Sequence, residues 1–236
     1  MGPESNDGIV DAALELASAP TVTETLERAV KVCEGVVSHC DMAGISVTHG
    51  GRVRTRAAST QELRTIDDLQ FLIHEGPCYD VLSVDGPVTA NDLATDERWP
   101  RWGKLVSART GAHASMSYRL FTEQDQLGAL NMYSTRPAAF GHQDLRDGYL
   151  VAAYAAAAVG SRMKEAQLTT ALESRTLIGQ ATGILMERFD LSAEAAFGLL
   201  RRISQTKNIK VVTLAQGLVE HGWLPVEKPD LPDGRQ

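Results

Sequence analysis

The sequence predicts an α+β protein in which a mixed N-terminal part is followed by a helical C-terminal part. Over residues 1–141, short β-rich runs alternate with helical stretches, and turns of a few polar or glycine residues join neighbouring runs. Such turns favour antiparallel pairing. After Pro137 the β-rich runs stop, and apolar residues recur every three to four positions, as they do in amphipathic helices. We therefore expect an antiparallel sheet flanked by helices, a long connecting helix and a C-terminal three-helix bundle.

Turn and cap residues give the order of the N-terminal elements. A helical region restarts near Thr23, with Thr21 as the alternative N-cap, because a hydroxyl at that position satisfies a free backbone N–H. His49-Gly50-Gly51 and Glu123-Gln124-Asp125-Gln126 each lie between two β-rich runs and predict hairpins. The expected elements are helices over 8–38, a hairpin over 42–59, a helix ending before Gly76-Pro77, a short strand over 87–91 and a hairpin over 113–137.

The region from about His142 to Met163 predicts one long helix. Two rows of residues repeat every seven positions along it, as in a short coiled coil. Small alanine side chains would let two such helices pack closely, so a dimer seam over 142–165 is one interpretation; a helix that covers its own sheet is the other. The rows are Leu145, Ala152, Val159 and Ala166, and Tyr149, Ala156, Met163 and Thr170.

Charge is distributed unevenly between the two parts. Residues 161–225 contain eight Lys/Arg and six Asp/Glu, a net charge of +2, although the whole chain carries −7. No acidic residue occurs between Ala195 and Val219, where four basic residues fall. This asymmetry suggests two modules with different partners, one of which could be a nucleic acid; a solvated helix face would give the same pattern.

The segment 175–189 predicts a helix despite two glycines. Each glycine inside a helix costs about 1 kcal/mol relative to alanine. On a helical wheel, Gly179 and Gly183 lie with Arg175 and Met186, opposite the apolar residues. This flat face would admit either a second helix or the backbone of a nucleic acid. Two further helices follow: one has Ser192 as its N-cap and apolar positions Ala196, Phe197, Leu200 and Ile203, and the other ends near Gly222.

No arrangement of residues supports catalysis, and no metal site or required cofactor is expected. His74, His113 and His142 are scattered, and the spacing of Cys33 and Cys40 does not match a zinc site. The third cysteine, Cys78, is interpreted as a buried structural thiol. An odd number of cysteines, no signal peptide and no apolar run of about 18 residues favour a cytoplasmic protein without a membrane segment.

The run "ALESRTLIGQATGILMERFDLSAEAAFGLLRRISQTKNIKVVTLAQGLV" resembles the ANTAR domain over about residues 161–225. The first 160 residues resemble a GAF domain, chiefly in "EGPCYDVLSVDGPVTANDLATDERWP" and "LGALNMYSTRPAAF". The receiver domain that precedes many ANTAR domains is not recognisable. The motif residues that carry the ANTAR resemblance are Arg175, Ile178, Gly179, Ala181, Gly183, Leu185, Met186, Ala196, Phe197, Leu200, Ser204, Asn208 and Lys210.

The resemblance implies a dimeric RNA-binding regulator of transcription antitermination that binds tandem short hairpins in nascent mRNA. Sequence-specific RNA recognition usually reads unpaired loop bases. The residues expected to contact RNA are Arg175, Gly179, Gln180, Gly183, Met186, Arg201, Arg202, Ser204, Gln205, Lys207, Asn208 and Lys210. A GAF domain implies a small-molecule effector of unknown identity, and the expected pocket residues are Gly76, Cys78, Trp99, Trp102 and His113.

Four segments are therefore expected. They are a GAF-like sensor domain (1–141), a connecting helix with a coiled-coil dimer seam (142–165), an ANTAR RNA-binding domain (166–225) and a disordered tail (226–236). The alternative function is a GAF sensor whose helical C-terminal domain binds a protein partner. The two functions differ in whether binding depends on the sequence of an RNA loop.

Overall fold

The computed structural model describes residues 3–49, 52–121 and 126–222. The chain divides into two compact units, Met1–Met163 and Lys164–Gln236. Helix α6 (His142–Phe189) supplies residues to both units. The first unit also contains α1 (Pro3–Ala17), α2 (Val22–Val36), β1 (Met42–His49), β2 (Arg52–Ala58), α3 (Gln61–Ile73), α4 (Pro77–Asp80), β3 (Val88–Ala90), α5 (Trp102–Thr110), β4 (Ala114–Phe121) and β5 (Gln126–Ser134).

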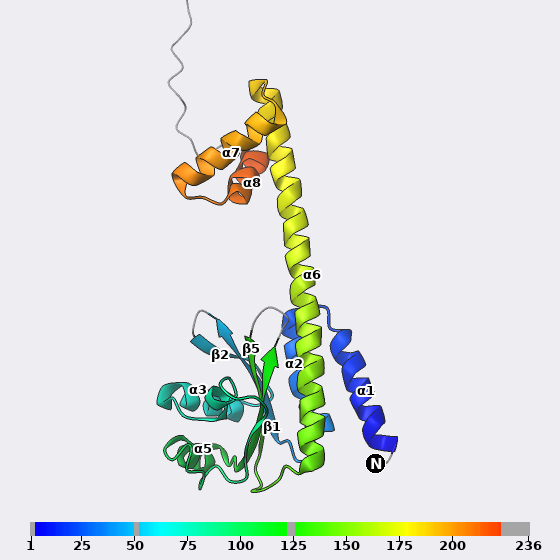
Figure 1. Cartoon of the computed structure of the whole chain (residues 1–236), viewed down its shortest axis with the longest axis vertical. Helices are drawn as coiled ribbons and strands as arrows, with labels where there is room; N and C mark the ends of the chain where they lie inside the picture. The colour runs from blue at the N-terminus through cyan, green and yellow to red at the C-terminus, as the bar shows by residue number, and fades with distance from the viewer. Residues whose placement is uncertain (1–2, 50–51, 122–125, 223–236) are drawn as a thin grey trace, which may run out of the picture. The chain divides into compact units, whose positions relative to one another are not determined.

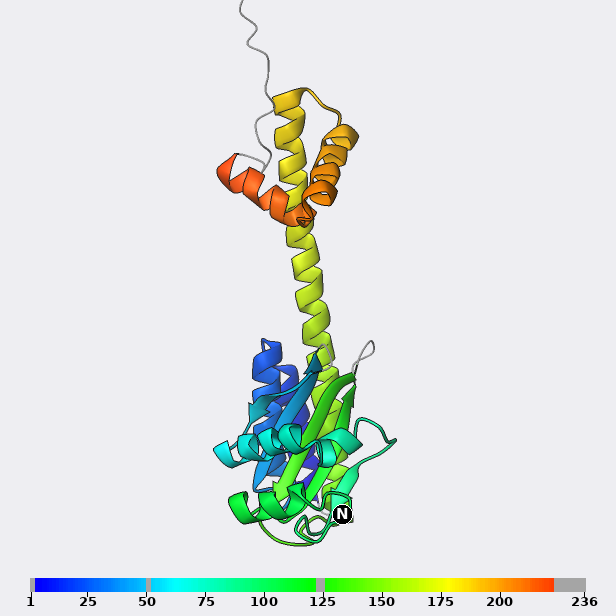
Figure 2. The same cartoon turned by 90° about the vertical axis from the view of Figure 1, so that its left-hand side faces the viewer.

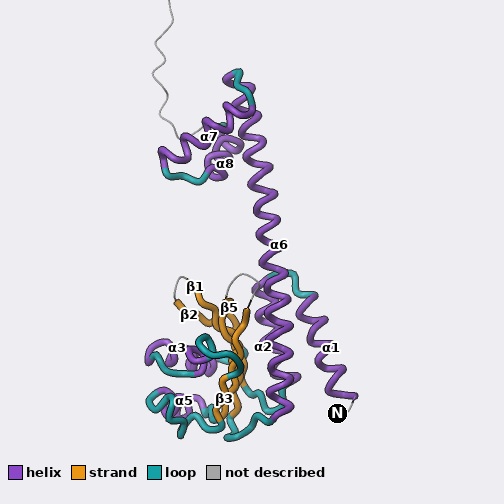
Figure 3. The backbone as a smooth tube through the Cα atoms, in the orientation of Figure 1, coloured by secondary structure: helices purple, strands orange, loops and turns teal. Residues whose placement is uncertain are grey.

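A five-stranded antiparallel sheet in the order β2-β1-β5-β4-β3 forms the centre of the first unit. Helix α2 and the first part of α6 cover one face, with α1 packed outside them against α2, and α3 and α5 cover the other (Figure 1; Figure 2 looks onto the α3 and α5 side). The three layers are also distinct in Figure 3, where the strands lie between the two sets of helices. This arrangement confirms the predicted α+β class.

The two faces of the sheet differ in polarity. On the face toward α2 and α6, buried apolar side chains form one core cluster, including Ile45 and Leu130, which are paired across β1 and β5. Residues one position along each strand point to the opposite face. There, Ser46, Ser117 and Asn131 are fully buried beneath α3 and α4. The first unit therefore buries an apolar face and a second face on which polar and apolar side chains are mixed.

The second unit is a bundle of the last part of α6 with α7 (Ala193–Lys207) and α8 (Val211–His221). Ser192 caps α7, since its Oγ accepts a hydrogen bond from the backbone N–H of Ala195 at 3.2 Å. The buried residues of the bundle are Ala181, Leu185, Ala196, Leu200, Ile203, Leu214, Ala215 and Leu218. The three-helix bundle and the Ser192 cap were both predicted correctly.

Several local expectations need correction. The N-cap of α2 is Thr21, whose Oγ1 accepts from the backbone N–H of Glu24 at 3.1 Å, and not Thr23. Helices α4 and α5, which are short, were not expected from the sequence. The expected turns at Gly50-Gly51 and at residues 123–125, and the tail 226–236, lie outside the described residues.

The first of the two heptad rows packs inside its own unit. Ala152 and Val159 belong to the apolar core cluster, and Leu145 packs against it. For these residues the structure favours the interpretation that the helix covers its own sheet. Ala166, the last residue of the row, lies in the second unit and is exposed. The domain limits at 141, 165 and 225 stay predictions; α6 begins directly after the first of them and runs past the second without interruption.

Candidate nucleic-acid interface

The outer face of α7 is basic and flat. Arg201, Arg202 and Gln205 are exposed, whereas Ala196 and Leu200 on the opposite side of the helix are buried. Gly198 lies one turn before the arginines, and a Cβ added there would have nothing within 4 Å. A polyanion can therefore approach the α7 backbone closely between positively charged side chains.

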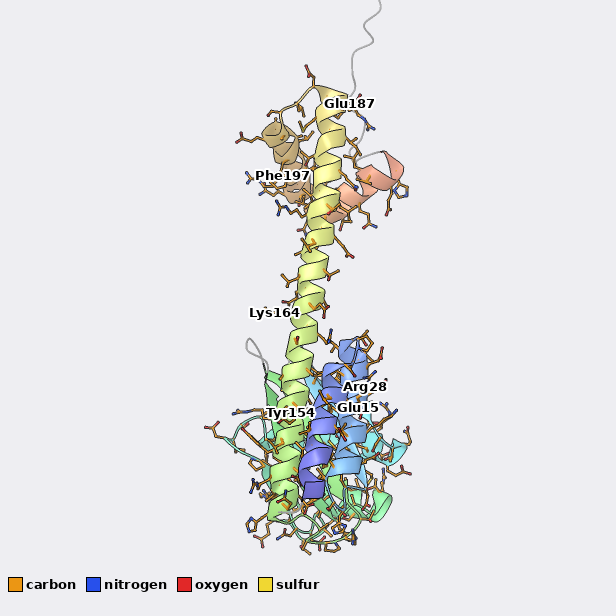
Figure 4. All side chains as sticks on the ribbon, turned by 90° about the vertical axis from the view of Figure 1, so that its right-hand side faces the viewer. Glu15, Arg28, Tyr154, Lys164, Glu187 and Phe197 are labelled. Atoms are coloured by element: carbon orange, nitrogen blue, oxygen red, sulfur yellow. The ribbon has the colours of Figure 1, made fainter. Side chains whose placement is uncertain are left out.

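Phe197 lies beside this face. The sequence analysis placed it among the apolar positions of α7, but its side chain is 43% exposed. The reason is rotation along the helix: Ala196, Leu200 and Ile203 form the buried stripe, and Phe197 lies about 100° away from Ala196. Figure 4 labels it on α7. Exposed aromatic rings are the usual stacking surfaces for unpaired bases, so Phe197 belongs to the candidate interface.

The turn between α7 and α8 is shaped by two residues that were expected to contact RNA. Asn208 has a left-handed backbone with φ of 53°, which asparagine tolerates better than most residues. The Ser204 hydroxyl donates to the carbonyl oxygen of Ile209 at 2.6 Å. Both residues thus help to shape the turn. Lys207 and Lys210, on either side of Asn208, are exposed.

The remaining expected RNA contacts lie on α6. Gly179 and Gly183 are exposed, and a Cβ added at either position would have nothing within 4 Å. Arg175 and Met186 share this side of the helix, away from the buried Ala181, and Gln180 is also exposed. The twelve expected residues therefore occupy two surfaces, one on α6 and the other on α7 with the following turn.

The residues expected to form a ligand pocket are packed in the core on the α3 side of the sheet. Trp99 and Trp102 make an edge-to-face pair with ring centroids 5.6 Å apart. The indole of Trp99 donates to Asp80 Oδ2 at 3.0 Å, and that of Trp102 to the Ile66 carbonyl at 3.3 Å. Cys78 is also buried there.

The other two expected pocket residues have structural roles of their own. Gly76 has φ of +134°, and a Cβ there would lie 2.3 Å from Gln70 Oε1. His113 Nδ1 lies 3.1 Å from Asp92 Oδ1. The proposal of a small-molecule pocket at these five residues stays a prediction.

A buried carboxylate lies between α3 and the face of the sheet that carries Ser46. Asp67 Oδ2 accepts hydrogen bonds from Ser46 at 2.8 Å and from Thr55 at 2.6 Å, and Oδ1 accepts from Gln70 at 3.2 Å. Burial raises the pKa of Asp67 to about 6 despite these donors. This cluster was not predicted, because a single aspartate in a helical sequence does not indicate whether its side chain is buried.

Two polar atoms near this cluster are buried without a hydrogen-bond partner in the structure. They are Ser115 Oγ and Asn131 Nδ2. Asn131 Oδ1 accepts from Ser117 Oγ at 2.7 Å. Burying a polar group without a partner costs free energy.

The three cysteine thiols are free and buried. Burial raises the pKa of Cys40 and of Cys78 to about 12, and raises that of Cys33 well above its usual value. Among the described residues, no group of three or more His, Cys, Asp or Glu side chains could hold a metal ion. Within the same ranges, no helix is long and apolar enough to cross a membrane.

The chain joins an α+β domain to a C-terminal three-helix bundle that carries exposed basic residues on α7. The GAF domain family matches residues 19–159, and the ANTAR domain family matches residues 166–219. The chain therefore belongs to the GAF domain family and carries a C-terminal ANTAR domain, as predicted. GAF domains are sensor modules, and ANTAR domains are RNA-binding modules of antitermination regulators. Among curated proteins, none matches the chain.

Solved structures support the GAF fold at low sequence identity. The phytochrome photosensory core module of Stigmatella aurantiaca aligns with a TM-score of 0.61 at 9% identity, over 85% of this chain and 44% of that one. The GAF domain of a phosphoenolpyruvate-protein phosphotransferase from Coxiella burnetii aligns with a TM-score of 0.56 at 13% identity, over 69% and 96%. This chain thus spans less than half the length of the phytochrome module, and these likenesses concern the fold alone.

Proposed function

We propose that the protein is a ligand-responsive regulator that promotes transcription antitermination by binding tandem short hairpins in nascent mRNA. The observation that carries this proposal is the exposed α7 face, where Arg201 and Arg202 flank the open backbone at Gly198 and Phe197 lies alongside. Lys207 and Lys210 continue the positive surface into the next turn. The basic side chains suit phosphates, and the aromatic ring suits an unpaired base.

In this proposal the GAF domain receives the signal. A small molecule of unknown identity, bound in the GAF domain, would change the affinity of the ANTAR domain for RNA. Two copies of the chain would present two RNA-binding surfaces to two hairpins, and the proposed site of action is the cytoplasm. No catalytic step is part of this function.

The alternative is a GAF sensor whose helical domain binds a protein. Its supporting observation is that Leu168, Leu172 and Phe189 on α6 are exposed and apolar, which suits a protein better than RNA. The absence of acidic residues from 195 to 219 in the sequence favours RNA for the α7 face.

Fluorescence-anisotropy titration of the full-length protein with a tandem-hairpin RNA tests the proposal. The control RNA keeps both stems and has scrambled loops. We expect loop-dependent binding that the double substitution Arg201→Ala/Arg202→Ala weakens by at least about tenfold, since two phosphate contacts are lost. Arg146→Ala, which removes an exposed arginine of the sensor domain, is the matched control and should bind normally. Binding that ignores both the loop sequence and the α7 arginines would refute the RNA function.

A further inference from the structure

A cavity of about 270 Å³ opens at one edge of the sheet in the first unit. Its lining comes from Tyr118 and Arg119 on β4, from one side of α6, and from the Gly86-Pro87 turn before β3. Helix α6 contributes Tyr149 and three alanines, whose small side chains leave the space open. A volume at the small end of the range for ligand pockets suits a small molecule.

The cavity lies where β4 becomes the edge of the sheet. Strand β3 pairs with β4 only over Ser115–Ser117, so beyond Ser117 the outer edge of β4 is not covered by β3. Tyr118 and Arg119 point to opposite faces of the sheet, and both line the cavity because it sits at this edge. Tyr118 and Ala152 belong to the core cluster toward α6. The residues expected to form a ligand pocket lie elsewhere, because their buried members belong to the core cluster on the α3 side.

Arg119 gives the cavity a positive charge. Its Nη2 donates to Asp85 Oδ1 at 2.9 Å, and its Nη1 donates to the carbonyl oxygen of Leu82 at 3.4 Å. Asp85 directly precedes the Gly86-Pro87 turn, so the guanidinium lies at that end of the cavity. The Asp85 side chain is fully exposed to solvent, and ion pairs of exposed carboxylates contribute little stability. The carboxylate of a ligand could therefore replace Asp85 at small cost and pair with Arg119 through two parallel hydrogen bonds.

Aromatic and methyl groups form the rest of the wall. The Tyr149 side chain is 62% exposed and lies at the rim. The Tyr118 ring is buried, and its hydroxyl donates to the carbonyl oxygen of Leu145 at 2.7 Å, which holds the ring in place. Aromatic rings pack favourably on one another in offset or edge-to-face geometry. An arginine at one end and rings and methyl groups along the wall match a flat molecule that carries one carboxylate.

We propose that this cavity binds a small aromatic carboxylate. The carboxylate pairs with Arg119 in place of Asp85, and the ring packs against Tyr149 and the alanines of α6. The proposed function supplies only the expectation of a small-molecule effector. The position of the site and the chemistry of its ligand rest on the lining of the cavity.

Ligand-observed NMR titration of the full-length protein without RNA tests the proposal, with benzoate and indole-3-acetate as probes. We expect at least one of them to bind, and its neutral amide to bind at least about tenfold more weakly. Ala153→Leu, which places a larger side chain at the exposed rim, should weaken binding by about tenfold or more. Ala157→Leu is the matched control: Ala157 is also exposed on α6 but is not part of this lining, so the variant should bind normally.

Substitution of the two charged residues tests the exchange of carboxylates. Arg119→Gln should weaken binding by about tenfold or more, and Asp85→Asn should strengthen it about threefold, because the competing carboxylate loses its charge. Circular dichroism would verify that the variants keep their fold, and Asp85→Asn decides the matter if Arg119→Gln does not fold. The inference is overturned if neither carboxylate binds, if Ala153→Leu binds normally, or if Asp85→Asn fails to raise the affinity. Because binding is measured without RNA, these outcomes do not depend on whether the RNA function holds.

Discussion

Substitution of Gly183 tests whether the flat face of α6 binds RNA or packs against another helix. The glycine lies in regular helix, is exposed, and an added Cβ would have nothing within 4 Å in its own chain. Gly183→Ala should therefore keep the fold and stabilise the C-terminal unit by about 1 kcal/mol, the difference in helix propensity. Gly183→Leu should also fold, because its larger side chain points into open space. If RNA lies against this face, the leucine should abolish RNA binding.

The stabilisation by Gly183→Ala can be measured as a shift in melting temperature. For a unit of 60–100 residues, 1 kcal/mol corresponds to roughly 4–8 °C. Circular dichroism melts of the full-length protein give this shift, and anisotropy titration gives the RNA affinity of the same samples. The matched control is Gly103→Ala, since Gly103 is also helical but its added Cβ would lie 2.0 Å from the carbonyl oxygen of Leu93. That variant should be destabilised, typically by about 1–3 kcal/mol as in other overpacked sites.

Two results would refute this reasoning. If Gly183→Leu unfolds the C-terminal unit or makes the protein monomeric, the glycine serves helix packing and not RNA. If Gly183→Leu folds and still binds RNA with unchanged affinity, the α6 glycine face is not part of the RNA interface. In that second case the proposed interface would contract to α7 and the turn that follows it.

Three further predictions concern other parts of the molecule. Arg201→Ala or Lys210→Ala should weaken binding to all RNA sequences and flatten its salt dependence, which titrations at several salt concentrations would show; an unchanged salt slope would argue against phosphate contacts. Phe197→Ala should lower RNA affinity by about 1–3 kcal/mol if a base stacks on it, whereas Phe197→Tyr should bind normally. Because burial raises the pKa of Asp67 to about 6, the stability it contributes is complete below pH of about 4 and is lost as the pH rises through about 6. The free energy of unfolding should therefore rise by about 1 kcal/mol between pH 7 and pH 5, and in urea denaturation Asp67→Asn should remove this part of the rise.

Local sequence features predicted most of the elements. Strand alternation and turn residues placed the two hairpins, and helical spacing placed α6, α7 and α8, because each signal depends on neighbours within a few residues. Ser192 was identified as a cap for the same reason. The short helices α4 and α5 were missed, since segments of this length carry too few turns for a periodic pattern to stand out.

The candidate site was predicted less completely. The basic residues of α7 and the α6 glycines were found from charge and composition, although their role in RNA binding stays a prediction. Phe197 was placed among the apolar positions of α7, yet it lies beside the arginines. Phe197 is exposed because it lies about 100° around the helix from the buried Ala196. Which stripe of α7 is buried depends on how α7 packs against α6 and α8.

The sequence by itself determined the α+β class, the two domains and the acid-free basic stretch, because these follow from periodicity, composition and motif. Only the tertiary structure decided that the row Leu145, Ala152 and Val159 packs on its own sheet. It also showed that Leu168 and Leu172 remain uncovered and that Asp67 is buried among hydroxyl donors. The physical reason is that a heptad or an aspartate has the same local sequence whether it is covered or exposed. Residues far away in the chain determine which of the two it is.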